Sequence, residues 1–403
     1  MSNQKISCKI CGAQTHVIQR HLAEAHAGIT LDQYRSLYPG EPVMSQAAID
    51  LLEKKKREEQ AAVKEEAVME MTASAAVTKE EGASISALIP KGQLVPRPLH
   101  EVFDFGSIKA AMNKRGDPIP ISVMTKHDQQ DMVPAVSNNY VYNIDELKDV
   151  ILAVEKNIPC YIWGHKGSGK SELWEQVCAR TNRPMQRVQH TVNTEESHIV
   201  GQWTVKGGET VFELGPLPMA MINGWVYVAD EYDFAMPSVL AVYQAVLEGK
   251  PLVIKEAPAE LRVIKPHPNF RMAATGNTNG SGDETGLYQG TLIQNSANYD
   301  RFGMVINKQY MDKKAESKIL QNTCAMNEPD ADKMIDFATQ IREAFAAGRM
   351  SDTVSPRTLI YASRIGVLRG SFRHGLNRSF ISKLCKVDRE VADGLAQRIF
   401  GAV

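Results

Sequence analysis

Eight consecutive residues follow the pattern G-x-x-x-x-G-K-[ST]: Gly164, His165, Lys166, Gly167, Ser168, Gly169, Lys170 and Ser171. Glycines in this pattern let backbone N–H groups turn inward around phosphate oxygens, and a helix that begins here adds the positive end of its dipole. The lysine reaches the β- and γ-phosphates, and the hydroxyl that follows it ligates Mg²⁺. We therefore expect Lys170 and Ser171 to hold the phosphates and the magnesium ion of ATP or GTP.

The segments on either side of this loop have the patterns that phosphate binding requires. Residues 159–163 form a short, mostly apolar run that is typical of a buried strand. Residues 171–180 carry apolar side chains at helical spacing, and residues 145–157 predict a further helix before the strand. The order of strand, glycine loop and helix predicts a nucleotide-binding α/β domain.

Polar residues also follow two other hydrophobic runs. Asp230 and Glu231 come directly after residues 225–229, and Asn277 follows the strand predicted over 270–275. A carboxylate at a strand end beside a phosphate loop can hold the Mg²⁺ shell, and its neighbour can orient and polarise the attacking water. We expect Asp230 and Glu231 to have these two roles. In an open parallel sheet the ends of the strands meet at one crevice, which predicts that all these residues lie together.

The order of these motifs resembles that of AAA+ ATPases. The resemblance implies that Asn277 is sensor 1, between the magnesium-binding carboxylate and the γ-phosphate. It also implies that Arg301, in Asp300-Arg301-Phe302, reaches the ATP of a neighbouring subunit. Arg357, which follows Pro356 at the start of a predicted helix, matches sensor 2.

Longer blocks are similar to the CobS-type ATPase subunits of aerobic cobaltochelatases, in the MoxR-type branch of AAA+ proteins. These blocks are Asp230-Glu-Tyr-Asp233, residues 280–291 with Asp300-Arg301-Phe302, and Ser355-Pro-Arg-Thr358. The similarity runs from about residue 130 to near the C-terminus. It implies a homo-oligomeric, hexameric ring, and a partner that carries a von Willebrand A domain or resembles a chelatase subunit. It also implies a β-hairpin insert, for which residues 191–213 around Gly207-Gly208 are the candidate.

A separate cluster of potential metal ligands lies near the N-terminus. Cys8, Cys11, His21 and His26 have the spacing C-x2-C-x9-H-x4-H, which can complete a tetrahedral Zn²⁺ site. His16 is a competing ligand. The residues that follow resemble the zinc finger of the Ros/MucR-type regulators, which bind DNA. Thr30 is then expected to cap a helix that is packed by Leu31, Tyr34 and Leu37.

These observations predict four segments in the 403-residue chain. They are a zinc-finger module over 1–48, a charged and flexible linker over 49–98, an AAA+ α/β domain with a parallel sheet over 99–310, and a small helical lid over 311–403. Within the linker, residues 49–71 are helix-prone and residues 72–86 have a composition that cannot support a core. In the lid, Met334, Phe337, Ile341 and Phe345 recur at helical spacing.

Net charge, hydrophobic content and the lengths of apolar runs exclude some classes of protein. The formal net charge is -1 and 43% of the residues are hydrophobic, which supports real cores and argues against a generally basic coat for nucleic acid. No run approaches the length of a membrane span, and the polar start is no signal peptide. We expect a cytoplasmic protein that does not contact a membrane. Cys160, Cys178, Cys324 and Cys385 are expected to be buried or incidental thiols.

Three functions remain open from the sequence. The first is a MoxR/CobS-like ATPase that hydrolyses ATP with Mg²⁺ to remodel or activate a partner protein. The second is the ATPase subunit of a cobalt or magnesium chelatase that acts in tetrapyrrole metal insertion. The third is a zinc-finger protein that binds DNA and whose assembly is switched by ATP.

Overall fold

The computed structural model describes residues 5–26, 28–47, 92–106 and 108–401. The chain divides into two compact units, residues 1–85 and 86–403. The predicted helix-prone and flexible parts of the linker, residues 49–86, lie outside the described residues. In the part of the chain that is described, no helix is both long and apolar enough to cross a bilayer.

The N-terminal unit contains a two-stranded antiparallel ribbon and two short helices. They are β1 Ile6–Ser7, β2 Gln14–Thr15, α1 Ile18–Ala25 and α2 Leu31–Leu37. The predicted cap is confirmed: the Thr30 hydroxyl accepts the backbone N–H of Gln33 at 3.3 Å. Tyr34 is buried as expected, but Leu37 is 63% exposed, so its predicted packing role was wrong. Leu37 lies six residues after Leu31, which in an α-helix places it on a different face. Tyr38 packs beside Tyr34 instead.

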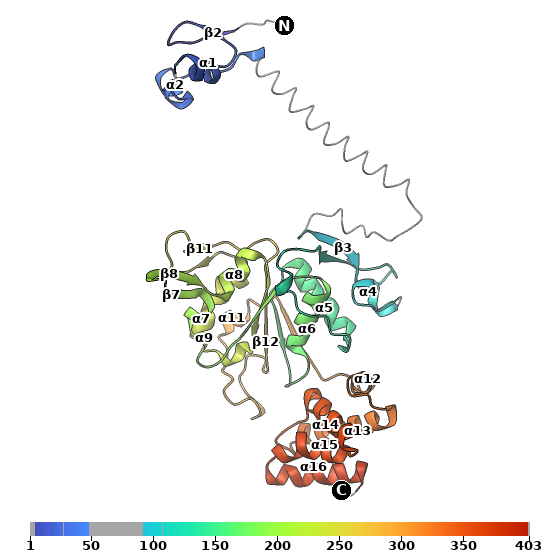
Figure 1. Ribbon diagram of the computed structural model, residues 1–403. Coiled ribbons are helices and arrows are strands. Elements are labelled where there is room, and N and C mark those ends of the chain that lie inside the picture. Colours follow the sequence, from blue (N-terminus) through green and yellow to red (C-terminus); the bar gives the residue numbers. More distant parts are fainter. Residues whose placement is uncertain (1–4, 27, 48–91, 107, 402–403) are drawn as a thin grey trace, which may run out of the picture. The chain divides into compact units, whose positions relative to one another are not determined.

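The second unit is built on five parallel strands (Figure 1), as predicted. Their spatial order is β13-β5-β12-β9-β6. The strands are β5 Cys160–Trp163, β6 Met185–Gln189, β9 Val226–Asp230, β12 Arg271–Gly276 and β13 Met304–Asn307. Strand β5, which leads into the glycine loop, therefore lies between β12 and β13. Asn277 follows β12, and Arg301 precedes β13.

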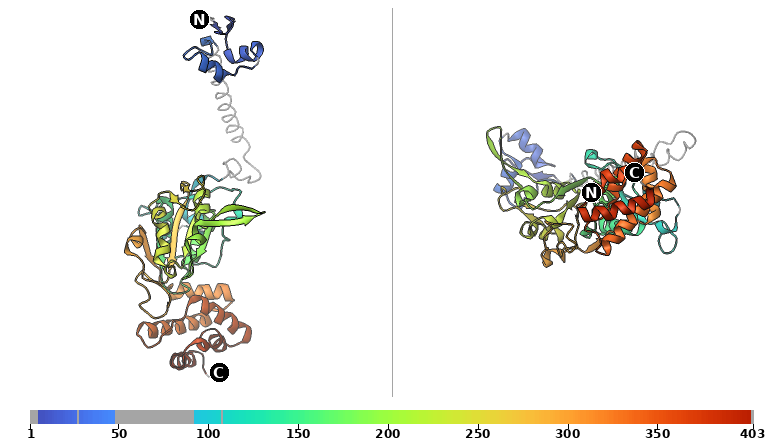
Figure 2. Two further views of the ribbon diagram at one scale, coloured as in Figure 1. Left: turned by 90° about the vertical axis from the view of Figure 1, so that its left-hand side faces the viewer. Right: turned by 90° about the horizontal axis from the view of Figure 1, so that it is seen from below.

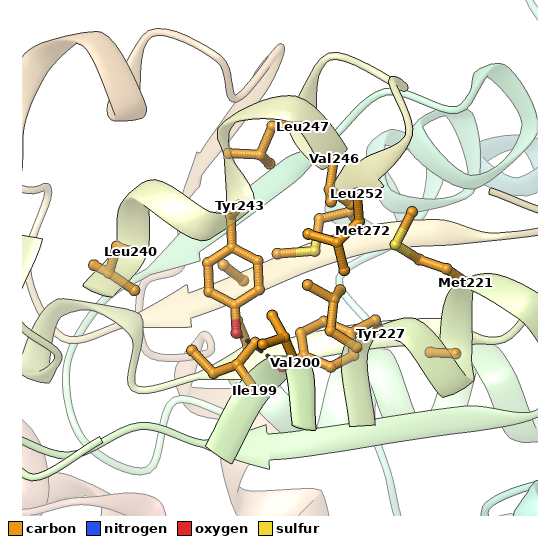
Figure 3. Close-up of a cluster of buried hydrophobic side chains, with 14 of the residues drawn as sticks. Ile199, Val200, Met221, Tyr227, Leu240, Tyr243, Val246, Leu247, Leu252 and Met272 are labelled. Atoms are coloured by element: carbon orange, nitrogen blue, oxygen red, sulfur yellow. Dashed lines mark hydrogen bonds between the residues drawn. The ribbon is translucent and has the colours of Figure 1, made fainter. Parts of the chain in front are cut away.

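Alternate side chains of these strands enter two different cores, because successive residues of a strand face opposite sides of the sheet. One core combines Cys160, Ile162, Val226 and Val228 with helices α5 Ile144–Lys156 and α6 Lys170–Arg180. The other combines Tyr161, Tyr227 and Met272 with helices α7 Glu196–Val200, α8 Pro216–Asn223 and α9 Pro237–Leu240 (Figure 3). The buried strands are therefore apolar on both faces, as in helix-covered parallel sheets.

Smaller ribbons flank the sheet. The predicted hairpin insert is confirmed as β7 Gly201–Lys206 and β8 Glu209–Leu214, which extend from the body of the unit (Figure 2). Gly207 and Gly208 both have positive φ, of 62° and 89°, as a two-residue hairpin turn requires. The other ribbons pair β3 Leu94–Pro98 with β4 Pro120–Met124, and β10 Leu252–Val253 with β11 Val263–Ile264. Three short helices also belong to this part: α4 Leu99–Val102, α10 Gln244–Leu247 and α11 Ser296–Tyr299.

The described residues after 311 form helices and no strand. The helices are α12 Lys313–Cys324, α13 Glu328–Ala346, α14 Pro356–Arg369, α15 Phe372–Ser379 and α16 Lys386–Phe400. Met334, Phe337 and Ile341 are buried in their shared core, as their spacing predicted. Phe345 is only partly buried and instead lies edge-on to the ring of His165 in the glycine loop.

Candidate active site at the strand ends

The glycine loop joins β5 to α6, which confirms the predicted strand–loop–helix order. Two of its glycines are required by close approach. A Cβ on Gly164 would lie 2.2 Å from the carbonyl oxygen of Lys308, and one on Gly167 would lie 2.8 Å from Cβ of Ser355. Both also have positive φ, of 152° and 73°. The loop is thus enclosed between the strand layer and the start of α14.

Lys170 bends back over this loop. Its Nζ donates to the carbonyl oxygens of Gly164 and His165 at 2.7 and 3.2 Å, and to Oδ1 of Asn277 at 3.0 Å. Burial lowers the pKa of Lys170 to about 8. A buried ammonium held by neutral oxygens is well placed to exchange these acceptors for phosphate oxygens, which carry charge and bind it more strongly.

Ser171 and Asp230 form the second part of the site. The Ser171 hydroxyl donates to Oδ1 of Asp230 at 2.6 Å, and the Thr275 hydroxyl donates to the same oxygen. Nε of Arg187 donates to Oδ2 of Asp230 at 2.8 Å. A hydroxyl beside a carboxylate at the phosphate loop is the oxygen donor set that Mg²⁺ takes in nucleotide sites, so these residues fit the ion. The buried hydroxyl of Ser168, which has no hydrogen-bond partner among the described residues, is a further group available to a ligand.

Glu231 follows Asp230 with a left-handed backbone, φ 53°. Its Oε2 accepts a hydrogen bond from Nε2 of Gln189 at 2.9 Å. Gln189 was not predicted from the sequence, although it ends strand β6 directly opposite Asp230. Gln189 and Glu231 are 42 residues apart in the sequence, so only the order of the strands shows that their side chains meet. The amide can hold the carboxylate in one orientation at the edge of the site.

Asp233 positions the end of strand β12. Its Oδ2 accepts the backbone N–H groups of Asn277 and Thr278 and the Thr278 hydroxyl, each at 2.8 Å. Burial raises the pKa of Asp233, and its hydrogen bonds oppose that shift. From the sequence, Asp233 stood out only as part of a block similar to CobS-type subunits. The structure shows that it fixes the backbone from which Asn277 reaches Lys170.

The two predicted arginines differ in position. Arg357 lies in the first turn of α14 and is exposed, and its charge adds to the burial that lowers the pKa of Lys170. Arg301 is held elsewhere: its Nε lies 2.7 Å from Oε1 of Glu248, and its Nη1 donates to the carbonyl of Ala297. The structure therefore brings Lys170, Ser171, Asp230 and Asn277 into one hydrogen-bonded network, and Arg301 has its polar contacts outside it.

The four predicted metal ligands of the N-terminal unit also come together. The ligand atoms of Cys8, Cys11, His21 and His26 all lie within 4.8 Å of one another. Sγ of Cys11 is 3.2 Å from Nε2 of His21, and Sγ of Cys8 is 4.0 Å from Nε2 of His26. The competing ligand His16 is not part of this cluster, because its Nδ1 bonds to the Ser45 hydroxyl at 2.8 Å. Two thiolates and two imidazoles fit tetrahedral zinc.

Comparisons with known proteins agree with this geometry. Residues 159–290 match the AAA domain of the dynein-related subfamily, and residues 316–399 match the CbbQ/NirQ/NorQ C-terminal domain. The chain is 34% identical over 280 residues to the aerobic cobaltochelatase subunit CobS of Sinorhizobium sp., with 67% of this chain and 83% of CobS covered. It is 28% identical over 258 residues to an uncharacterized protein of Staphylococcus haemolyticus, with 62% and 93% covered.

Among solved structures, the Thermotoga maritima RuvB Holliday junction branch migration motor aligns at 12% identity. The alignment covers 67% of this chain and 75% of RuvB, with a TM-score of 0.39. The extent of the match to CobS and the two matching domains identify the family. The chain belongs to the CobS-like, MoxR-type family of AAA+ ATPases.

Proposed function

We propose that this ATPase works as a hexameric ring, binds ATP with Mg²⁺ between subunits, and uses hydrolysis to remodel or activate a partner protein. The observation that carries the proposal is the network of Lys170, Ser171, Asp230 and Asn277 at the strand ends. Lys170 would bind the β- and γ-phosphates, and Asn277 would orient it and contact the γ-phosphate. Arg357 would contact the nucleotide from α14. The residue before this helix, Ser355, lies against Gly167 of the loop.

Ser171 and Asp230 would hold the magnesium ion, which when bound offsets the charge of the phosphates. Glu231 would then orient and polarise the attacking water, with Gln189 setting the direction of its carboxylate. Arg301 has its polar contacts outside the nucleotide network of its own subunit, so we assign its role to the nucleotide of a neighbouring subunit. A ring is the assembly that supplies such a neighbour to every subunit.

The test is the variant Glu231→Gln, which keeps the shape of the side chain and removes its charge. We expect it to bind ATP and to lose hydrolysis, because water is no longer polarised. Held in ATP, it should capture its partner, which mass spectrometry can identify. Full hydrolysis in this variant would contradict the assignment of Glu231. A captured protein with a von Willebrand A domain would support the remodelling role.

The second candidate function is that of a chelatase ATPase subunit, and the identity of 34% to CobS favours it. In that case the captured partner is a chelatase large subunit that acts on a tetrapyrrole. ATP-dependent insertion of cobalt or magnesium with a complete set of chelatase subunits would establish it. Absence of insertion with that set would leave the remodelling function.

For the N-terminal unit we propose a zinc ion bound by Cys8, Cys11, His21 and His26. In a module this small, metal binding supplies much of the folding free energy. The resemblance to DNA-binding fingers supports a third candidate, DNA binding switched by ATP-dependent assembly. A gel-shift titration at several salt concentrations tests it, because phosphate contacts make binding salt-dependent. Binding that is unchanged when Cys8 and Cys11 are replaced would exclude the finger from that role.

A further inference from the structure

The segment between β12 and α11 forms a loop whose role the motifs of the site do not explain. Asp283 organises this loop: its Oδ1 accepts the N–H and the hydroxyl of Thr285 at 2.9 and 3.0 Å. Its Oδ2 accepts the N–H of Tyr288 at 2.7 Å. The N–H of Gln294 closes the base of the loop on the carbonyl of Gly280 at 2.8 Å. The carboxylate therefore sets the position of the backbone from which Tyr288 extends.

Tyr288 reaches from this loop to the phosphate-binding loop. Its hydroxyl accepts the backbone N–H of Lys166 at 2.9 Å and lies 3.0 Å from Nδ1 of His165. The side chain is 8% exposed. Burial raises the pKa of Tyr288 to about 12, so the hydroxyl keeps its proton at neutral pH. Burial also lowers the pKa of His165, which favours the neutral ring, and Nδ1 of a neutral ring can accept a hydrogen bond when the proton is on Nε2.

One of the two residues that Tyr288 contacts, His165, is also one of the two on which Lys170 rests. Nζ of Lys170 binds the carbonyl oxygens of Gly164 and His165. His165 also stacks on the ring of Tyr310, with centroids 5.8 Å apart, and the Tyr310 hydroxyl donates to the carbonyl of Lys166 at 3.2 Å. The first half of the phosphate loop is thus held between two tyrosines, one of them delivered by the Asp283 loop.

We propose that Tyr288 is a positioning residue for nucleotide binding, and that the loop organised by Asp283 serves to place its hydroxyl against His165 and Lys166. A phosphate loop that is held in its binding conformation loses less conformational entropy when nucleotide binds. The hydroxyl has no direct contact with Lys170, which would bind the phosphates, or with the carboxylates of Asp230 and Glu231. Its effect is therefore expected on affinity, and much less on the turnover of bound ATP.

The test is Tyr288→Phe, which keeps the ring and removes the hydroxyl. Loss of the two hydrogen bonds that the hydroxyl makes to the loop should raise the dissociation constant for ADP with Mg²⁺ at least about five- to tenfold, measured by calorimetry. The KM for ATP should rise by a similar factor, while kcat at saturating ATP stays within about twofold. The matched control is Tyr299→Phe, which removes a hydroxyl from α11, where the ring packs on Tyr161 and Phe302.

A second variant, Asp283→Asn, separates positioning from general stability. Its amide has one acceptor oxygen in place of two, so either Tyr288 or Thr285 loses the acceptor of its N–H, and the loop places the hydroxyl less firmly without removing it. If both residues act through one contact, the double variant should bind ADP about as tightly as Tyr288→Phe alone. Additive losses, or wild-type affinity in Tyr288→Phe, would overturn the inference.

This inference rests on nucleotide binding at the phosphate loop, which belongs to the proposed function. Lys170→Ala separates the two, because it should lose binding altogether. A wild-type protein that binds no nucleotide would refute the proposed function. A wild-type protein that binds ADP while Tyr288→Phe binds it equally well would refute only the role of Tyr288.

Discussion

Replacement of Arg301 by alanine tests the ring mechanism most directly. In its own subunit Arg301 contacts Glu248 and the carbonyl of Ala297, and the side chains of the Arg301–Glu248 pair are 27% and 33% exposed. Arg301→Ala should therefore leave the ATP affinity of its own subunit unchanged. If the guanidinium completes the site of a neighbouring subunit, the same change should remove most of the hydrolysis.

The two effects differ greatly in expected size. An ion pair this accessible to solvent contributes little to folding, because water screens it. In a unit of this size the melting temperature should then fall by at most about 3 °C. An arginine that stabilises the transition state for phosphoryl transfer contributes about 10³–10⁵-fold in rate. A small change in stability with a large loss of turnover would thus distinguish a catalytic guanidinium from a structural one.

The assay measures steady-state release of phosphate, with ATP binding and thermal unfolding measured on the same preparations. Arg20→Ala is the matched control, because Arg20 forms an exposed ion pair with Glu24 at 2.9 Å in the N-terminal unit. Mixing Arg301→Ala with Lys170→Ala subunits should restore part of the activity, since each mixed interface can combine an intact loop with an intact arginine.

Three outcomes would refute this reasoning. Hydrolysis within about tenfold of the wild type, with normal ATP binding, would show that Arg301 does not stabilise the transition state. Mixed subunits that are no more active than the separate variants would show that it does not act between subunits. Loss of ATP binding in Arg301→Ala would place the residue in its own nucleotide site, contrary to the contacts in the structure.

Three further predictions concern other parts of the chain. Gln189→Ala should bind ATP normally but hydrolyse it about tenfold more slowly, because the Glu231 carboxylate loses its partner; unchanged kcat would contradict this. A metal chelator should release one zinc per chain and make Cys8 and Cys11 reactive toward a thiol reagent, whereas equal reactivity without chelator would exclude bound metal. Burial lowers the pKa of His190, so the unfolded chain binds the proton more readily than the folded one below about pH 6.5. The free energy of unfolding, from urea titrations, should then fall by at most about 1.4 kcal/mol per histidine between pH 7.5 and 5.5, and His190→Gln should reduce that fall.

Much of the nucleotide site could be predicted because the residues that would bind the nucleotide lie in short sequence motifs. The positions of Lys170 and Ser171 follow from one glycine loop between a strand and a helix. Asp230 and Asn277 could be predicted because parallel strands bring their carboxyl ends together, whatever lies between them in the chain. The metal-ligand quartet was equally local, since its members lie within 19 residues of sequence, Cys8 to His26.

The residues that support this site could not be found in the same way. Gln189, Asp233 and Tyr288 act on partners 42, 44 and 122 residues away, through side-chain hydrogen bonds. No periodicity or spacing encodes such a pair, because the distance between the two side chains depends on strand order and on how a loop returns to the sheet.

The sequence alone therefore determined the chemistry of the phosphate loop, the strand-end carboxylates and the Cys/His cluster, because each is set by residue type at short spacing. Tertiary structure alone decided which side chains orient those groups. It also decided that Leu37 faces solvent and that Arg301 rests on Glu248, since burial and pairing depend on surfaces that distant segments of the chain supply.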